Sequence, residues 1–298
     1  MANIGFVGLG HMGFAMALNL IKANHQVTGF DLNKDALAAF SKAGGISAQS
    51  LSSIAASDFF ITVLQTGQQV SEVYLGEEGL FAKASKTSLF IDCSSIDVET
   101  TKMLHEQAKK RGLCTIDAPV SGGMAGARDA TLTFLAGGEE KEVQRAIPIL
   151  NAMGKKIIPT GASGSGQAAK ICNNLILGIS MIAVSEAFVL ARHLGLSSHR
   201  LFEVVNNASG QCWTMSHYCP APDILPGVPA SHHYEPGFAA AMMLKDLKTS
   251  QQAAKEAGIT TPLGAAATEL YQQFNAQGFG QLDFSAIIKA IEKQAIAL

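Results

Sequence analysis

A glycine-rich turn near the start of the chain constrains its fold more than any other feature. Residues 4–7 are apolar and predict a short buried strand, and Gly8, Gly10 and Gly13 follow it as G-x-G-x-x-G. Apolar residues then recur at helical spacing from Met16 onward. A strand that turns through three such glycines into a helix begins a βαβ unit, so we expect a parallel sheet.

Each glycine of this turn has a distinct expected role in binding a dinucleotide. Gly8 makes the tight turn, Gly10 lets the backbone approach a pyrophosphate, and Gly13 lets the helix pack close to the strand. The helix start supplies N–H groups and a partial positive charge for the phosphates. An ordinary glycine-rich turn is the alternative. The expected cofactor contacts on the turn are Gly8, Leu9, Gly10, His11, Met12 and Gly13.

Asp31 directly follows the second predicted strand, residues 26–30. An acidic residue at this point of a dinucleotide-binding unit accepts hydrogen bonds from the ribose hydroxyls and repels the 2′-phosphate of NADP. Lys34 is close by, but a single lysine after an aspartate makes a poor phosphate pocket. The expected cofactor is therefore NAD. Asp31 could instead be a helix N-cap or turn residue, since aspartate favours those positions too.

Composition excludes several classes of function. A chain of 298 residues is long enough for two domains, and its net charge of −2 gives no basic surface for nucleic acid or an anionic membrane. Residues 175–184 are apolar but too few to span a bilayer. Five scattered cysteines and no secretory signal favour the cytoplasm. The histidines lack ligand spacing, as with the adjacent His232 and His233, so we expect no metal.

Strand and helix patterns alternate through the first half of the chain and then give way to helices. The predicted strands are residues 4–7, 27–30, 59–63, 89–92, 114–117, 132–136 and 156–159. The predicted helices between them include residues 34–43, 70–74, 98–111 and 141–153. This alternation predicts a doubly wound, mostly parallel sheet. A glycine- and serine-rich run at 161–166 ends it, so the expected domains are residues 1–163 and 164–298.

Two features of the second half stand out. The helix expected at about residues 167–193 is apolar nearly all round, as is typical of a helix that joins two domains or two subunits. Five prolines exclude regular helix between residues 219 and 236, hereafter the proline-rich loop. Loops of this length in compact domains are often functional.

Three clusters could carry chemistry. Asp117 to Gly123 follows a predicted strand, and its Ser121-Gly122-Gly123 turn offers a hydroxyl and backbone N–H groups for a carboxylate, although it could equally be a flexible loop. Lys170 and Asn174 share one face of the long helix, where apolar neighbours would lower the lysine pKa, unless Lys170 simply reaches solvent. Lys245-Asp246 alone could be an exposed pair at a helix start.

Taken together, these motifs resemble the β-hydroxyacid dehydrogenase family, in family order over essentially the whole chain. The resemblance implies a Rossmann-like domain, then an all-helical domain joined by the long helix, with the active site in the cleft and dimers or tetramers formed through the helical domain. The motifs that carry it are Gly8 to Gly13, Asp117 to Gly123, Gly164-Ser165-Gly166 with Lys170 and Asn173-Asn174, and Lys245-Asp246-Leu247.

The resemblance also implies a role for each site residue. Lys170 is the acid/base, Asn174 helps to position the substrate, and Ser121, Gly122 and Gly123 hold its carboxylate. On the cofactor side, Ser95 lies beside the nicotinamide ribose, Lys245 reaches the cofactor from the second domain, and Leu64 and Gln65 border it. Asp246 lines the cleft. Gln65 stands where relatives usually have proline, which leaves the detail of that loop open.

Within the family, the loop around Cys212-Trp213 and the proline-rich loop are most similar to members that oxidise 3-hydroxyisobutyrate to methylmalonate semialdehyde in valine catabolism. A tartronate semialdehyde or succinate semialdehyde reductase is the alternative enzyme. A non-catalytic module of the same fold would lack Lys170, which is present. We further expect Trp213 and Phe238 to line the pocket for the 2-methyl group, unless both only pack the helical domain.

Overall fold

The computed structural model describes the backbone of residues 1–296 and the side chains of residues 1–293. The chain forms two compact units, Met1–Lys170 and Ile171–Leu298, and the division falls inside a long helix. The expected boundary at residues 163 and 164 comes just before that helix.

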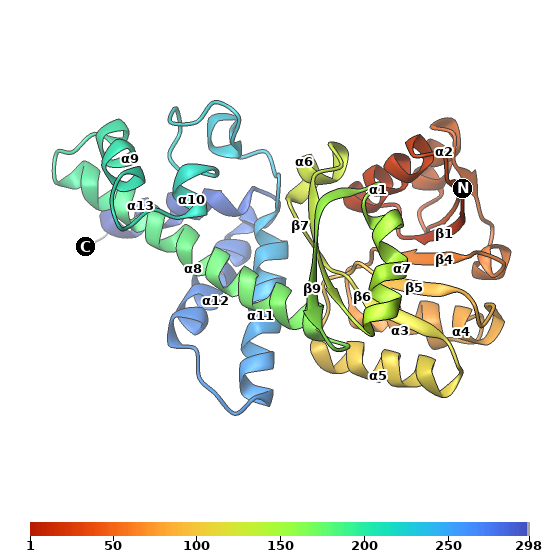
Figure 1. The fold of residues 1–298 in the computed structure, drawn as a ribbon. Helices are drawn as coiled ribbons and strands as arrows, with labels where there is room; N and C mark the ends of the chain where they lie inside the picture. The colour runs from red at the N-terminus through yellow and green to blue at the C-terminus, as the bar shows by residue number, and fades with distance from the viewer. Residues whose placement is uncertain (297–298) are drawn as a thin grey trace. The chain divides into compact units, whose positions relative to one another are not determined.

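The first unit is built on one nine-stranded sheet (Figure 1). Its parallel part has the order β3-β2-β1-β4-β5-β6, the order of a doubly wound dinucleotide-binding sheet. Strand β8 pairs antiparallel with β6 and β7, and β9 runs parallel to β8. The strands are β1 (Asn3–Val7), β2 (Gln26–Phe30), β3 (Ile46–Ser47), β4 (Phe59–Thr62), β5 (Leu89–Asp92), β6 (Cys114–Asp117), β7 (Val120–Ser121), β8 (Leu132–Gly137) and β9 (Gly154–Gly161).

Helices cover both faces of this sheet because its strands carry apolar side chains on both sides. Ile61 and Ile91 lie in one hydrophobic core, whereas Phe60 and Phe90 lie in a separate core on the opposite face. The first core takes side chains from α1 (His11–Lys22), α2 (Lys34–Lys42), α6 (Gly123–Arg128) and α7 (Glu140–Leu150). The second takes them from the 3-10 turn η1 (Leu51–Ile54), α3 (Gly67–Leu75), α4 (Leu80–Lys83) and α5 (Val98–Lys110).

The predicted doubly wound domain is confirmed, and the strands predicted at residues 89–92 and 114–117 have the observed bounds. Five short elements of this unit escaped prediction: β3, η1, α4, β7 and α6. Each has six residues or fewer, so its sequence has too little periodicity to show. In particular, Ser121 lies in β7 rather than in a free loop, paired with Thr133 of β8.

The second unit is helical and has its own core. Its largest buried side chains are Tyr271, Phe188, Phe274 and Phe284. Tyr271 and Phe274 share one helix, whereas Phe188 and Phe284 come from two other elements, so the unit is held together by contacts distant in sequence. The elements are the later part of α8 (Ser165–His193), then α9 (Ser198–Asn206), α10 (Trp213–Ser216), η2 (Pro229–Ser231), α11 (Ala240–Glu256), α12 (Pro262–Phe274), η3 (Asn275–Phe279), η4 (Phe284–Ile287) and α13 (Ile288–Ile296).

The proline-rich loop is irregular except for η2, as predicted, but it is packed rather than loose. Val228, Ala230 and Tyr234 are buried in the core of the second unit. The Tyr234 hydroxyl donates to the carbonyl of Pro220, which ties the two ends of the loop together.

Helix α8 is long and apolar enough to cross a membrane. Half of its most apolar stretch is buried inside the structure, and the core helix of a globular domain can be equally long and apolar. Length and composition therefore do not indicate a membrane span by themselves.

Candidate active site

The site in the first unit begins as a row of strand ends. Val7 pairs in register with Thr62, Thr62 with Asp92, and Asp92 with Asp117, and each is the last residue of its strand. The segments that follow therefore leave the sheet along one edge, the carboxyl edge where ligands bind in sheets of this kind. The predicted cofactor and carboxylate segments after β1, β4, β5 and β6 all start there (Figure 1).

The glycine turn after β1 has the geometry that its sequence predicts. Gly8 has a φ of 97°, and a Cβ on it would lie 2.3 Å from the carbonyl oxygen of Val63. A Cβ on Gly13 would lie 1.9 Å from the carbonyl oxygen of Gly8. Around Gly10 nothing lies within 4 Å of such an atom, so the backbone is open there.

The start of α1 fits an anionic group such as a pyrophosphate. Gly10 caps the helix with no side-chain hydrogen bond, and the first turn carries no acidic residue. Its N–H groups and the positive end of the helix dipole are thus opposed by no negative side chain of that turn. The chain's own residues therefore fit the dinucleotide that the sequence predicts.

Asp31 does more than its predicted role requires. Its Oδ2 accepts a hydrogen bond from the Leu9 N–H at 2.6 Å, and its Oδ1 accepts one from the Asn33 N–H at 2.7 Å. The carboxylate thus connects the end of β2 to the glycine turn. Nothing in the sequence had indicated this contact. The N-cap of α2 is Asn33, not Asp31. Asp31 is partly exposed, so its remaining lone pairs are available to ribose hydroxyls.

A buried hydrogen-bond network positions the next two segments. Asp92 Oδ1 accepts from the Thr62 hydroxyl at 2.7 Å and from the Ser94 N–H at 3.1 Å. The Ser94 hydroxyl in turn accepts from the Leu64 N–H at 2.9 Å. The predicted cofactor segments at Leu64 and Ser95 are therefore braced against each other. Burial raises the pKa of Asp92 to about 6, although the hydrogen bonds from Ser94 and Thr62 oppose that rise.

Gln65 lies just beyond this network, directly before Thr66, the N-cap of α3. Its N–H donates to the side-chain oxygen of Gln69, which also closes the capping box of Thr66. The segment is therefore shaped by its own helix cap, without the proline that relatives usually have at Gln65.

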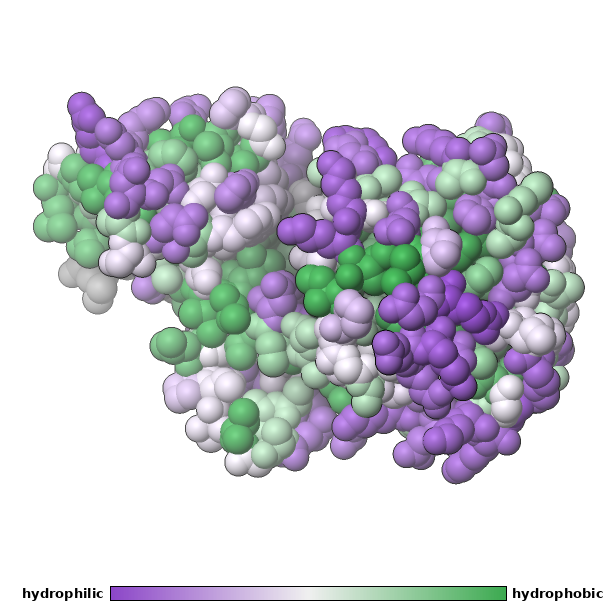
Figure 2. Space-filling view, viewed as in Figure 1, coloured by the Kyte–Doolittle hydropathy of each residue, from purple (hydrophilic) through white to green (hydrophobic). Residues whose placement is uncertain are grey.

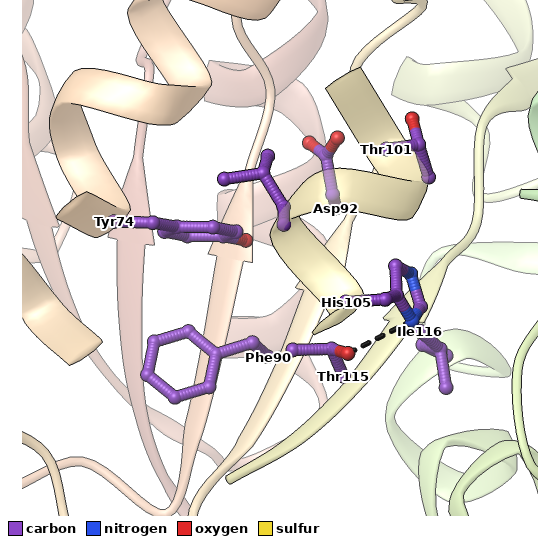
Figure 3. Close-up of a pocket in the computed structure, with 8 residues that line it drawn as sticks. Tyr74, Phe90, Asp92, Thr101, His105, Thr115 and Ile116 are labelled. Carbon is purple, nitrogen blue, oxygen red and sulfur yellow. Dashed lines mark hydrogen bonds between the residues drawn. The ribbon is translucent and has the colours of Figure 1, made fainter. Parts of the chain in front are cut away.

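A small pocket lies near the same strand ends (Figure 3). Its volume is about 10 Å³, roughly the room that the centre of one water molecule needs. Asp92, Tyr74 and His105 line it, and His105 shares a hydrogen bond of 2.9 Å with Thr115. Burial and the nearby carboxylate of Asp92 both raise the pKa of Tyr74 well above its usual value. The site is too small for a substrate.

The predicted carboxylate-binding turn follows β6. Gly122 and Gly123 have φ values of 134° and 62°, in the region that favours glycine, and they lead from Ser121 into α6. Asp117, fully buried at the end of β6, accepts hydrogen bonds from the N–H groups of Gly164 and Gln167. Asp117 therefore anchors the start of α8, and Lys170 follows three residues after Gln167.

The predicted site residues of the second unit form one chain of polar contacts. Asn174 is 1% exposed, and its side-chain N–H donates to Asp246 Oδ2 at 2.5 Å. Asn173 donates to the side-chain oxygen of Asn174, and Lys245 Nζ lies 3.4 Å from Asp246 Oδ1. Reading Lys245-Asp246 as an exposed pair is wrong, because Asp246 is 8% exposed and both residues lie within α11.

Trp213 and Phe238 belong to one aromatic cluster, made with Tyr218 and Phe284. Trp213 stacks on Tyr218 with ring centroids 5.2 Å apart, and Phe238 meets Phe284 edge-on at 5.6 Å. Tyr218 and Phe284 are themselves 5.2 Å apart. Trp213 is 51% exposed, so it is not a core residue of the second unit.

Asp283 organises this cluster and was missed by the sequence analysis. Its Oδ2 accepts from the Tyr218 hydroxyl and from the N–H groups of Gly237 and Phe238, at 2.9 to 3.0 Å. Its Oδ1 accepts from the N–H and hydroxyl of Ser285. Burial raises the pKa of Asp283 despite these bonds. Only the D-x-S spacing of a local turn, Asp283 to Ser285, could have pointed to it.

Among the residues whose side chains the structure describes, no group of three or more His, Cys, Asp or Glu is arranged to hold a metal ion. The same part of the chain has all five cysteines as free thiols.

Two family models match the chain in succession. Residues 3–161 match the NAD binding domain of 6-phosphogluconate dehydrogenase, and residues 164–291 match the NAD-binding domain of NADP-dependent 3-hydroxyisobutyrate dehydrogenase. Fold and site together thus define an NAD(P)-binding β-hydroxyacid dehydrogenase.

Similar proteins narrow this class. A probable 3-hydroxyisobutyrate dehydrogenase of Mycobacterium bovis is 43% identical over the whole of both chains. The solved structure of the Mycobacterium tuberculosis 3-hydroxyisobutyrate dehydrogenase with L-serine has a TM-score of 0.93 at 43% identity, covering 98% of this chain and 99% of that one. An NAD-dependent L-serine dehydrogenase of Pseudomonas aeruginosa is 39% identical over 98% of each chain. The chain belongs to the 3-hydroxyisobutyrate dehydrogenase family.

Proposed function

We propose that the protein oxidises 3-hydroxyisobutyrate to methylmalonate semialdehyde with NAD, as a step of valine catabolism. The observation that carries the proposal is the arrangement on α8. Lys170 stands one turn before Asn174, and Asp246 fixes the amide of Asn174. This arrangement gives a proton-transferring group and a rigid hydrogen-bonding group on neighbouring turns, which a dehydrogenase of hydroxy acids needs.

The reaction removes a hydride from the carbinol carbon and a proton from its hydroxyl. A bound nicotinamide dinucleotide supplies the hydride acceptor. Lys170 Nζ takes the hydroxyl proton during oxidation and returns it to the carbonyl oxygen during reduction. Asn174 has a second side-chain N–H besides the one bound to Asp246, and it donates to the substrate oxygen. Ser121 and the N–H groups of Gly122 and Gly123 bind the carboxylate.

Asp31 supports NAD as the cofactor. The Leu9 and Asn33 N–H groups hold its carboxylate in place, so a 2′-phosphate would meet a fixed negative charge. We expect Asp31→Asn to narrow the preference for NAD over NADP, because it removes the charge and keeps one acceptor oxygen. A parent protein that prefers NADP in steady-state assays contradicts this choice.

L-serine is a second candidate substrate, because one relative is named for its oxidation and the M. tuberculosis structure contains it. L-serine differs from 3-hydroxyisobutyrate in carrying an ammonium group where the latter has a methyl. In the aromatic cluster, Trp213 is the exposed ring, and its apolar surface would pack against the methyl group.

A panel assay tests the proposal. The protein is incubated with NAD or NADP and with each enantiomer of 3-hydroxyisobutyrate, L-serine, 3-hydroxypropionate, glycerate or 4-hydroxybutyrate. We expect the highest kcat/KM with 3-hydroxyisobutyrate and NAD. A higher kcat/KM with L-serine would favour the second candidate. The highest kcat/KM with glycerate would indicate a tartronate semialdehyde reductase, and the highest with 4-hydroxybutyrate a succinate semialdehyde reductase. Lys170→Ala should lower kcat by about 10²- to 10⁴-fold and leave NADH affinity nearly unchanged.

We further propose a homodimer or homotetramer in the cytoplasm, with a small hydroxy acid as its substrate and without nucleic-acid or membrane partners. Exposed apolar side chains near the end of α8, in the connection that follows it and on α9 support the oligomer, and Figure 2 shows apolar surface in that region. These side chains are Leu190, Leu194, Leu196 and Val204. Light scattering of the purified protein tests the proposal, and a monomer at micromolar concentration contradicts it.

A further inference from the structure

Gln167 joins three parts of the first unit that sequence analysis treats separately. It lies in the first turn of α8 and is fully buried. Its side-chain N–H donates to the Ser94 carbonyl at 2.7 Å, and its side-chain oxygen accepts from the Ile96 N–H at 3.2 Å. The amide therefore binds the backbone on both sides of Ser95. Its own N–H donates to Asp117 Oδ2 at 2.9 Å.

The contacts of Gln167 fix the start of α8 against the carboxyl edge of the sheet. A buried side-chain amide with both ends bonded has one orientation, because turning it over would set its N–H against the Ile96 N–H and its oxygen against the Ser94 carbonyl. Lys170 lies one helical turn further along the same helix. Any shift of residues 94–96 relative to this turn must therefore break two buried hydrogen bonds.

We propose that Gln167 is a positioning residue, which holds Ser95 at a set distance from Lys170 and so aligns the proton-transferring group with the nicotinamide end of the cofactor. The inference rests on the proposed function, in which Ser95 lies beside the nicotinamide ribose and Lys170 is the acid/base. Gln167 itself touches neither substrate nor cofactor. A misplacement of about 1 Å at a reacting group can lower a rate by about 100-fold.

The test is Gln167→Met, which keeps the length of the side chain and removes both hydrogen bonds. Steady-state rates are measured with saturating NAD and either 3-hydroxyisobutyrate or L-serine, and NADH affinity is measured by fluorescence titration. We expect kcat to fall about 10- to 100-fold with NADH affinity changed less than about fivefold, because the glycine turn is untouched. Thermal unfolding confirms that the variant is folded at the assay temperature.

Ser88→Ala is the matched control. Ser88 precedes β5 at its amino end, is 1% exposed, and donates a buried hydrogen bond to the Ser57 carbonyl. Its loss should lower the melting temperature without changing kcat. A Gln167→Met variant with parental kcat, or one that loses only stability as the control does, overturns the inference. A parent protein that oxidises none of the panel acids overturns the proposed function, and with it this inference.

Gln167→Glu adds a second measurement, the pH dependence of kcat, which would not change if Gln167 only stabilised the fold. When protonated, the introduced carboxyl can still donate to the Ser94 carbonyl; when ionised, it repels that oxygen. The ratio of variant to parent kcat should therefore fall as pH rises through the ionisation of this carboxyl, at temperatures where both proteins stay folded. A ratio that is flat with pH, or that rises, contradicts the proposed positioning role.

Discussion

The glycine turn after β1 and the Asp283 cluster in the second unit are built in opposite ways. The turn uses consecutive residues, Gly8 to Gly13, and what it offers a ligand is backbone. The Asp283 cluster gathers side chains from three separate stretches of the chain, around residues 213–218, 237–238 and 283–285. The glycine turn could be predicted from the sequence because consecutive residues form it. The Asp283 cluster could not, because it forms only when distant segments of the chain come together.

The difference also separates two kinds of sensitivity. A backbone turn fails when a side chain is added at a crowded position, because Gly8 and Gly13 have no room for a Cβ. A side-chain hub fails when a side chain is removed, because the donors around it lose their acceptor. Variants of the two regions should therefore fail in opposite ways.

The largest expected effect is that of Gly13→Ala. A Cβ at 1.9 Å from the Gly8 carbonyl oxygen cannot be accommodated without moving the turn or α1. We expect loss of soluble, folded protein, or a loss of more than about 4 kcal/mol in the free energy of unfolding.

Gly10→Ala is the control for that variant. Nothing surrounds Gly10 within 4 Å of an added Cβ, so stability should change by about 1 kcal/mol or less. NADH affinity, measured by fluorescence titration, should still fall at least about tenfold, because the open backbone is where the pyrophosphate approaches. Parental NADH affinity in Gly10→Ala would contradict the expected approach of the pyrophosphate. A stable Gly13→Ala variant would contradict the crowding at that position.

Asp283→Ala should have the next largest effect on stability. It leaves three backbone N–H groups and two hydroxyls without their acceptor, so we expect a loss of about 3–5 kcal/mol in unfolding free energy. Urea unfolding measures it. Glu269→Ala is the control, because that carboxylate is exposed in the same unit, and its loss should cost less than about 0.5 kcal/mol. A similar loss of unfolding free energy in both variants would show that the hydrogen bonds of Asp283 do not stabilise the cluster.

Asp92 gives a pH-dependent version of the same test in the first unit. Its pKa of about 6 lies above the usual 3.8, so the folded protein binds a proton more tightly than the unfolded chain. This contribution to stability is present below about pH 4 and is lost as pH rises through 6.

Asp92→Asn removes the ionisation and keeps one acceptor oxygen. Its stability relative to the parent should therefore be greater at pH 8 than at pH 4, by up to about 3 kcal/mol for a shift of roughly two units. Chemical unfolding at both pH values measures the difference. A variant whose relative stability is the same at both pH values shows that folding does not raise the pKa of Asp92.

The smallest expected effect concerns substrate choice. Trp213→Ala should lower the preference for 3-hydroxyisobutyrate over 3-hydroxypropionate by one to two orders of magnitude at most, because one methyl group in an apolar pocket is worth about 1–3 kcal/mol. The ratio of the two kcat/KM values measures it. Leu263→Ala, at another exposed apolar residue of the second unit, should leave the ratio unchanged. Equal losses on both substrates for Trp213→Ala indicate packing instead.

The sequence predicted most of what consecutive residues build. The doubly wound sheet, the glycine turn and the long α8 follow from local patterns of glycine and apolar spacing. Trp213 and Phe238 were paired only by their nearness to the proline-rich loop, and nothing in the sequence showed that Tyr218 and Phe284 join them.

The supporting polar residues could not be predicted for the same physical reason. Gln167, Asp92 and Asp283 act through hydrogen bonds to partners distant in sequence or through burial, and neither leaves a periodic signal. Asp117 was noticed only as the start of a turn, although its main contacts are to the N–H groups of Gly164 and Gln167.

The placement of Lys170 and Asn174 on a single helix also limits how genes of this kind can change in length. Four residues of α-helix set the two side chains about 40° apart around the axis, and one inserted codon between them would set them about 140° apart. A one-codon deletion would turn Asn174 by the same roughly 100° in the other direction and set the two side chains about 60° apart. We therefore expect insertions and deletions in natural variants to collect in connecting loops and to be purged from this stretch of α8, whatever hydroxy acid each variant uses.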